Sequence, residues 1–331
     1  MSRDFARAQQ NQTLLHPTLP QEESAASVPS ADYTFVVCAD TQFGMTKNNK
    51  DWEAEKSYSR QVIQQINALE ERPLFCCVCG DLVHMTADIY AKERTEAECH
   101  RIQDAQNADF QQIWAALHED IALVCLCGNH DVGNRPTAQS VDRFRQAFGN
   151  DYLAFWVRGT YNIVVNTSLF NNPTGAPDLF AEQFQWLRER LQYAREKKAL
   201  HIFVFGHHPW FLYQQDEDPD KGDLPGASPF PKECPIEGSM PDSYFVIPLE
   251  MRRKVLALFE EYGVRAAFAG HFHQNVVSES KFGMAMITTS SLSIVLKSTG
   301  VPHDFDEPNT RGMRIVRVGQ DGSFGHRFVS L

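Results

Sequence analysis

Five apolar runs in this 331-residue chain each end in side chains that can bind metal ions or transfer protons. In chain order, the five ends are Asp40-Thr41-Gln42, Gly80-Asp81, Gly128-Asn129-His130-Asp131, Gly206-His207-His208-Pro209 and Gly270-His271-Phe272-His273. Four of them place a glycine directly before the polar group, where the backbone must turn and approach its neighbours closely. Because ligands bind at the carboxyl ends of strands in α/β sheets, we expect the five ends to meet at one edge.

The residue types suit a pair of divalent cations acting on a phosphate ester. Two such ions, about 3.5–4 Å apart, can stabilise both the attacking and the leaving oxygen of an in-line phosphoryl displacement. The pair needs a carboxylate that bridges both ions, and Asp81, fixed by Gly80, is the candidate. Asp40 and the side-chain carbonyl of Asn129 add hard oxygen ligands. Three histidines supply imidazole ligands: His207, His271 and His273.

His130 stands between a predicted ligand, Asn129, and a carboxylate, Asp131. We expect Asp131 to orient the ring, so that His130 acts as a proton donor or charge stabiliser and not as a ligand. Taken alone, G-N-H-D is also compatible with a turn and a helix cap, since Asn and Asp favour both. The ordered set of five motifs, and not any single one, predicts the site.

The sequence around the motifs alternates short apolar runs with helical periodicity, which predicts an α/β fold. We expect strands at residues 33–39, 74–79, 121–127, 201–205 and 264–269, and two strands joined by a glycine turn within 156–166. We expect helices at 51–70, 86–118, 180–197 and 248–262, the last starting at Pro248. A short helix ending near Phe148 has Thr137 or Ser140 as its cap. Only short β-like runs follow residue 274.

One α/β domain is expected over residues 31–331, because no linker divides the chain. Residues 1–30 are polar and rich in Gln, Ser and Pro, which predicts a mobile tail without the apolar segment of a secretory signal. Residues 213–245 are acidic and rich in Pro and Gly, which predicts a long surface loop, called the acidic excursion below. It is either a solvated loop or a contact for a protein partner.

The composition and charge of the chain limit the kinds of partner and the location that we expect for the protein. The formal net charge of −11 repels phosphate backbones, so we expect no nucleic acid partner. We also expect no membrane span, since every apolar run falls short of the roughly 18 residues that one needs. Most of the eight cysteines lie inside apolar runs in a C-x-C pattern, which favours buried thiols over a zinc site. A reducing, cytoplasmic location follows.

The five motifs D-T-Q, G-D-L-V-H, G-N-H-D, G-H-H-P and G-H-F-H resemble, in order, the blocks of the calcineurin-like metallophosphoesterase superfamily. The resemblance covers about residues 33–331. It implies a four-layer αββα sandwich, with two mixed sheets flanked by helices and two metal ions at one edge.

A narrower resemblance is carried by D-T-Q-F-G, G-D-L-V-H, G-N-H-D-V-G-N-R-P-T-A and Y-N-I-V-V-N-T-S-L-F. These stretches are similar to calcineurin-like phosphoesterase domain-containing proteins, which are cytosolic enzymes regarded as serine/threonine protein phosphatases. That family has D-P-Q-F-G in the first block, so glutamine is expected at position 42. Thr41 in place of proline should alter only the turn.

The resemblance also implies an assignment of ligands. Metal 1 would take Asp40, Gln42, Asp81 and His273, and metal 2 would take Asp81, Asn129, His207 and His271. Gln42 would bind through its amide oxygen or through a water. In G-H-H-P the family uses the histidine two residues before the proline, which favours His207 over His208. His84 would lie near the substrate, or would be a satisfied histidine at the surface.

We therefore expect two divalent metal ions, with Mn²⁺ or Mg²⁺ favoured and iron or Zn²⁺ as alternatives. The expected activity is hydrolysis of phosphate monoesters by in-line attack of a metal-bound hydroxide, on phosphoserine or phosphothreonine in proteins or on small phosphoesters. One alternative is a phosphodiesterase acting on a nucleotide or phospholipid headgroup. The other is a partner-binding scaffold of the same fold, against which the intact ligand set argues.

Overall fold

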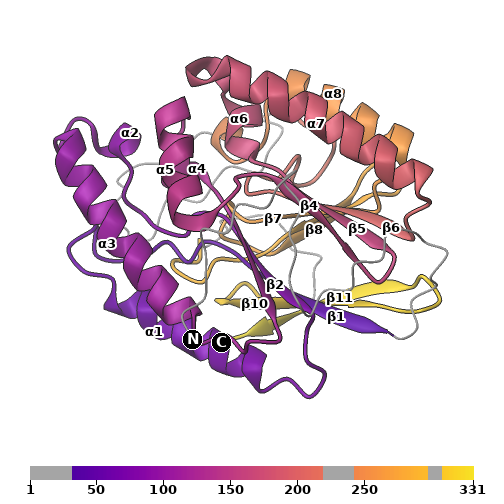
Figure 1. Cartoon of the computed structure of the whole chain (residues 1–331), viewed down its shortest axis with the longest axis horizontal. Helices are drawn as coiled ribbons and strands as arrows, with labels where there is room; N and C mark the ends of the chain where they lie inside the picture. The colour runs from indigo at the N-terminus through magenta and orange to yellow at the C-terminus, as the bar shows by residue number, and fades with distance from the viewer. Residues whose placement is uncertain (1–31, 219–241, 297–307) are drawn as a thin grey trace.

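The computed structural model describes residues 32–218, 242–296 and 308–331. The predicted tail at 1–30 and most of the acidic excursion therefore lie outside the described residues. Figure 1 shows the chain as two sheets that pack face to face between two layers of helices, which confirms the expected αββα sandwich.

The two sheets are both mixed. The first has the order β11-β10-β1-β2-β3 and the second the order β4-β5-β6-β7-β9-β8. The first sheet comprises β1 (Tyr33–Cys38), β2 (Phe75–Cys79), β3 (Ala122–Leu126), β10 (Gly312–Val318) and β11 (Phe324–Ser330). The second comprises β4 (Leu153–Val157), β5 (Thr160–Val164), β6 (His201–Phe205), β7 (Ala266–Ala269), β8 (Val276–Glu279) and β9 (Ala285–Thr288). Strands β1, β2 and β3 are parallel neighbours, as are β5, β6 and β7.

Helices cover the outer face of each sheet. Side chains of α1 (Glu53–Asn67), α3 (Glu96–Trp114) and α5 (Ala138–Phe148) pack against the first sheet. Those of α7 (Pro177–Glu196) and α8 (Leu249–Tyr262) pack against the second. Shorter helices occur in the connections between these elements along the chain: α2 (Ala87–Tyr90), α4 (Asn129–Val132), α6 (Thr167–Asn171), η2 (Pro173–Gly175) and η4 (Asp242–Tyr244).

Alternation along β1 explains why its sequence is apolar throughout. Phe35 and Val37 face the other sheet, whereas Val36 and Cys38 face the helices, so both faces of the strand are buried. Phe35 stacks on Phe75 at 4.5 Å between ring centroids and contacts Phe203 of the second sheet at 5.9 Å. One apolar layer thus joins the two sheets.

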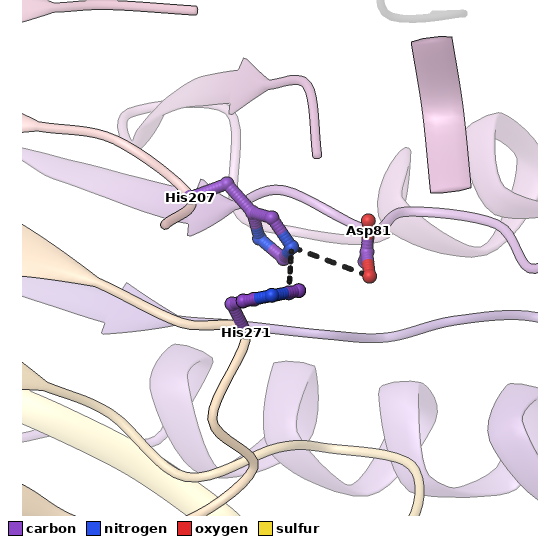
Figure 2. Close-up of side chains that lie close together, drawn as sticks. All are labelled: Asp81, His207 and His271. Atoms are coloured by element: carbon purple, nitrogen blue, oxygen red, sulfur yellow. Dashed lines mark hydrogen bonds and ion pairs between the residues drawn. The ribbon is translucent and has the colours of Figure 1, made fainter. Parts of the chain in front are cut away.

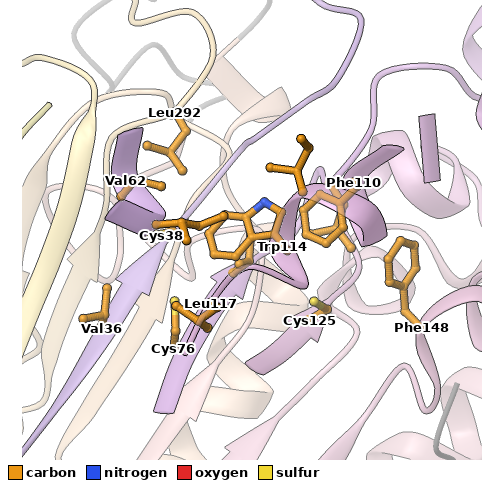
Figure 3. Close-up of a cluster of buried hydrophobic side chains, with 14 of the residues drawn as sticks. Val36, Cys38, Val62, Cys76, Phe110, Trp114, Leu117, Cys125, Phe148 and Leu292 are labelled. Carbon is orange, nitrogen blue, oxygen red and sulfur yellow. The ribbon is translucent and has the colours of Figure 1, made fainter. Parts of the chain in front are cut away.

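The cysteines behave as small buried hydrophobes. Seven of the eight lie in the described part of the chain, and all seven are buried as reduced thiols. Figure 3 shows Cys38, Cys76 and Cys125 among the aromatic side chains of the helix-facing core, around Trp114. Burial inside an apolar core explains their presence without a zinc site.

Most predicted elements agree with the structure to within a few residues, but the helix expected at 86–118 is two helices. Thr95 starts the second one: its hydroxyl accepts from the Glu98 backbone N–H, and the Glu98 carboxylate accepts from the Thr95 N–H. Thr137 caps α5, as expected. Pro248 is the residue before α8 and not its first residue.

Candidate metal centre and catalytic site

The five polar strand ends meet at one edge of the sandwich, and backbone contacts tie them together. The Asp40 N–H donates to the Gly80 carbonyl at 3.1 Å, which joins the ends of β1 and β2. The His271 N–H donates to the Asp40 carboxylate at 2.9 Å, which joins the two sheets. The His130 N–H donates to Oδ1 of Asp81 at 2.8 Å. Segments far apart in the sequence are thereby held in one fixed cluster.

The backbone at this edge is strained. Five predicted ligands adopt the left-handed conformation that residues other than glycine rarely adopt: Asp40 (φ 52°), Gln42 (φ 41°), Asp81 (φ 49°), His271 (φ 67°) and His273 (φ 57°). Such strain persists only where the surroundings impose it, and it gathers at functional sites. The clustering of these residues at one place therefore supports a functional site.

Asp81, His207 and His271 form the centre of the cluster (Figure 2). Their ligand atoms all lie within 4.8 Å of one another, and all three residues are buried. Nε2 of His207 lies 3.3 Å from Oδ2 of Asp81 and 3.1 Å from Nδ1 of His271. Oδ1 of Asn129 is 3.1 Å from the same His207 nitrogen. Four predicted ligands of metal 2 thus converge.

Backbone carbonyls hold four imidazoles in place. One ring nitrogen in each lies 2.6–2.8 Å from a carbonyl oxygen: His207 with Cys79, His271 with Tyr244, His273 with Ile294, and His130 with His84. A ring nitrogen that donates to a carbonyl leaves the other nitrogen with a lone pair and a fixed direction. This is how proteins orient histidines that bind metal ions or exchange protons.

The amide of Asn129 has its orientation fixed in the same way. Its Nδ2 donates to Oδ1 of Asn134 at 3.0 Å and to the hydroxyl of Tyr244 at 2.9 Å. Both amide hydrogens are therefore engaged, and the amide oxygen is left to face His207.

The predicted ligands of metal 1 lie beside this cluster. Oδ1 of Asp40 is buried and lies 3.2 Å from Nε2 of His273. Nε2 of Gln42 donates to Oδ2 of Asp81 at 3.3 Å, and its Oε1 accepts from the hydroxyl of Ser293 at 3.3 Å. Asp81 therefore contacts the predicted ligands of both metal 1 and metal 2, as a bridging ligand must.

The negative charge of Asp81 makes this set of ligands a favourable place for a positive charge. Burial opposes a charge on His207, but the adjacent Asp81 carboxylate outweighs it and raises the pKa of His207 to about 10. Burial, followed by the charge of His207, holds the pKa of His271 well below its usual value. Carboxylate oxygens, an amide oxygen and imidazole nitrogens crowded into a buried space are the ligands that divalent metals take. The residues present therefore fit a metal centre.

Asp131 occupies a different place from the one we expected. Its carboxylate accepts from the backbone N–H groups of Leu82, Val83 and Gly128, at 2.7–3.2 Å. Burial and the charge of Asp81 raise its pKa to about 8, against the effect of these N–H groups. The ring of His130 is oriented by the His84 carbonyl instead. Asp131 joins the loops after β2 and β3.

His84 is likewise placed differently from the expected substrate contact. Its side chain is fully buried, and its Nε2 lies 2.7 Å from the hydroxyl of Tyr90. Its pKa is held well below the usual value, chiefly by burial. The ring lies against His130 and not in a position open to substrate.

The two adjacent histidines of G-H-H-P have distinct surroundings. His207 contacts Asp81, as described, whereas Nδ1 of His208 lies 3.1 Å from the hydroxyl of Thr167. This supports His207 as the ligand. Four further residues contact the site but belong to none of the five strand-end motifs, so the sequence does not mark them: Tyr90, Asn134, Tyr244 and Ser293.

Comparisons with known proteins identify a family model and relatives that match most of the chain. Residues 33–275 match the family model described as calcineurin-like phosphoesterase. The chain is 32% identical to the human serine/threonine-protein phosphatase CPPED1, with 90% of this chain and 84% of that protein covered. It is 30% identical to the zebrafish protein of the same name, covering 91% of this chain and 86% of that one.

Solved structures show the same fold at low sequence identity. A purple acid phosphatase from yellow lupin aligns with a TM-score of 0.60 at 13% identity, over 92% of this chain and 53% of that one. A dimetal phosphatase from Danio rerio aligns with a TM-score of 0.52 at 14% identity, over 90% and 99% of the two chains.

Among the described residues, none of the helices has the length and apolarity needed to cross a membrane.

Proposed function

The chain belongs to the calcineurin-like phosphoesterase family and is therefore a phosphoric ester hydrolase, and we propose that it is a dinuclear-metal phosphatase acting on phosphoserine and phosphothreonine in proteins. One observation carries this proposal. Carboxylate oxygens, an amide oxygen and oriented imidazole nitrogens from both sheets converge beside a histidine, His130, whose ring is held by a carbonyl.

Two groups of residues would hold the metals. Metal 1 would be held by Asp40, Gln42, Asp81 and His273, and metal 2 by Asp81, Asn129, His207 and His271. When bound, the two ions supply Lewis acidity, which neutralises charge on the phosphoryl group and makes a water more acidic. The share of oxygen ligands favours Mn²⁺ or Mg²⁺, with Zn²⁺ or iron as alternatives.

His130 is the residue we assign to the leaving group. Its Nδ1 is bound to the His84 carbonyl, so Nε2 is the nitrogen that can hold a proton for the departing serine or threonine oxygen. Its backbone N–H donates to Asp81, which fixes the residue against the proposed bridging carboxylate. The same ring, when protonated, would stabilise negative charge on the phosphoryl oxygens.

The proposed substrate class is supported by the relatives, which are named as serine/threonine-protein phosphatases. We propose a phosphorylated protein as the main substrate, with small phosphoesters accepted by the same centre. A cytoplasmic location accords with the buried, reduced thiols of the described cysteines.

The test compares three substrates on metal-stripped protein to which Mn²⁺ or Mg²⁺ is returned: p-nitrophenyl phosphate, bis-p-nitrophenyl phosphate and a phosphoserine peptide. We expect metal-dependent hydrolysis of the peptide and the monoester, with the diester much slower. Faster hydrolysis of the diester would instead support a phosphodiesterase. Binding of metal without hydrolysis of any of the three would overturn the proposal.

A further inference from the structure

Tyr244 lies against the proposed metal centre, although no motif marks it. It is the last residue of η4 and stands at the end of the acidic excursion. Its hydroxyl lies 2.9 Å from Nδ2 of Asn129, and its carbonyl oxygen lies 2.8 Å from Nε2 of His271. Its ring also packs on that of His271, with centroids 4.8 Å apart. One residue thus contacts two proposed ligands of metal 2 through three different groups.

These contacts decide which atoms face the metal site. The hydroxyl accepts one hydrogen of the Asn129 amide, which helps turn the amide oxygen toward His207. The carbonyl accepts the Nε2–H of His271, so Nδ1 is the nitrogen that keeps its lone pair. Rotation of the amide or a change of tautomer would present an N–H to the cation instead.

The surrounding fold holds Tyr244 firmly. The guanidinium of the fully buried Arg252 donates to the carbonyls of Gln215 and Glu217, near the start of the acidic excursion. It also donates to the carbonyl of Ile247, just after the end of the excursion, at 3.1–3.2 Å. Phe245 is buried against Phe272. Tyr244 is thus held close to Ile247, which is bound to Arg252 of α8, and next to the buried Phe245.

We propose that Tyr244 is a positioning residue of the metal centre, which sets the affinity of the metal 2 site by orienting Asn129 and His271. This inference rests on the proposed function, because it presumes that Asn129 and His271 bind a cation. It assigns a role to a residue at the end of the acidic excursion, where the sequence suggested only a solvated loop or a partner contact.

Asn134 provides the means to test this role. Its Oδ1 accepts the second hydrogen of the Asn129 amide, so Tyr244 and Asn134 share the task of holding that group. Either acceptor alone should keep the amide largely oriented. With both removed, the amide can rotate freely. The effects of the two substitutions on metal binding should therefore be coupled.

The experiment is a double-mutant cycle with Tyr244→Phe and Asn134→Ala, in which Mn²⁺ is titrated into metal-stripped protein by calorimetry. Tyr244→Phe removes only the hydroxyl. We expect each single variant to raise the Kd of one of the two metal equivalents by only about 3-fold, and the double variant by about 100-fold, well above the product of the single effects. The other equivalent should change little. Tyr262→Phe, at the end of α8, serves as the matched control and should bind as the wild type does.

The outcomes separate this inference from the proposed function. A wild type that binds fewer than two equivalents would contradict the dinuclear centre itself. A wild type with two equivalents, combined with a double variant whose effect equals the product of the single effects, would overturn the positioning role of Tyr244. The melting temperatures of the metal-free variants are measured alongside. Weaker binding that merely follows a lowered melting temperature would also overturn it.

Discussion

The imidazole ring of His84 lies parallel to that of His130, with the centroids 4.6 Å apart and the planes inclined by 19°. The backbone carbonyl of His84 also lies 2.8 Å from Nδ1 of His130. His84 thus supports the proposed catalytic histidine twice, through its ring and through its backbone. The hydroxyl of Tyr90 in turn lies 2.7 Å from the His84 ring nitrogen and 3.0 Å from Oδ1 of Asn48.

Tyr90→Phe should therefore weaken the support of His130. The substitution leaves the buried Nε2 of His84 without its hydroxyl partner, which should cost about 1–3 kcal/mol in the free energy of unfolding. We also expect a lower kcat with unchanged metal content, because the ring beneath His130 loses its anchor. Urea unfolding, steady-state kinetics and metal analysis measure the three quantities. An unchanged kcat in a variant that is clearly less stable would show that the Tyr90–His84 contact is structural only.

His130→Ala should affect the rate far more than the metals. A positioned proton donor contributes roughly 10²–10⁴-fold to the rate, and we expect a loss of kcat on that scale. Metal stoichiometry should remain that of the wild type, because His130 is not a proposed ligand. If the role is proton donation, p-nitrophenyl phosphate should lose less than a phosphoserine peptide, since its leaving group needs no proton. Equal losses would indicate charge stabilisation. His100→Ala, on α3, is the control.

Asp131→Ala should act mainly on stability. The carboxylate accepts from the N–H groups of Leu82, Val83 and Gly128, and removing it leaves these buried donors unpaired. Each unpaired donor should cost about 1–3 kcal/mol in the free energy of unfolding. Asp120→Ala, at a half-exposed side chain, should cost far less. Wild-type stability in Asp131→Ala would contradict the assigned role.

Sequence adjacency explains why the expectation for Asp131 differed from the structure. His130 and Asp131 are consecutive residues of α4, and side chains at neighbouring helical positions do not face each other. The strand-end motifs were predictable because a buried apolar run followed by Gly and a polar residue marks where a strand ends. The site residues outside those motifs were not. Tyr244 lies close to Ile247, whose carbonyl accepts from Arg252, and it holds His271 with a carbonyl that every residue possesses.

Asp81→Asn tests the proposed bridge. The substitution keeps the shape of the side chain but removes the negative charge shared between the two proposed ions. We expect loss of at least one metal equivalent and nearly complete loss of turnover, measured by elemental analysis and by hydrolysis of p-nitrophenyl phosphate. Oδ1 can still accept from the His130 N–H, so the fold should be retained. Two ions retained together with normal turnover would contradict a bridging role.

Gln42 offers the most specific test of how this site differs from one built with an imidazole at that position. In the structure its amide nitrogen, not its oxygen, faces Asp81, and the oxygen accepts from Ser293. A hydroxyl can donate or accept, so Ser293 can serve the amide in either orientation. Rotation of the amide would turn its oxygen toward Asp81 and the proposed metal 1 site. Direct ligation therefore needs no change in the backbone.

Gln42→His and Gln42→Ala should therefore change the affinity of the metal 1 site in opposite directions. An amide oxygen is a weaker and harder ligand than imidazole, so Gln42→His should bind metal 1 more tightly and shift its preference toward Zn²⁺ or iron. Gln42→Ala should fold but need more Mn²⁺ to reach half of its maximal activity. Titrations of the three proteins with Mn²⁺ and Zn²⁺, followed by calorimetry and by activity, measure both effects. Tighter binding in Gln42→His need not raise kcat, because the metal also governs the acidity of its water and the release of phosphate. If all three proteins titrate alike with both metals, Gln42 is neither a direct nor a water-mediated ligand, and Asp40 is the one metal ligand of the first motif.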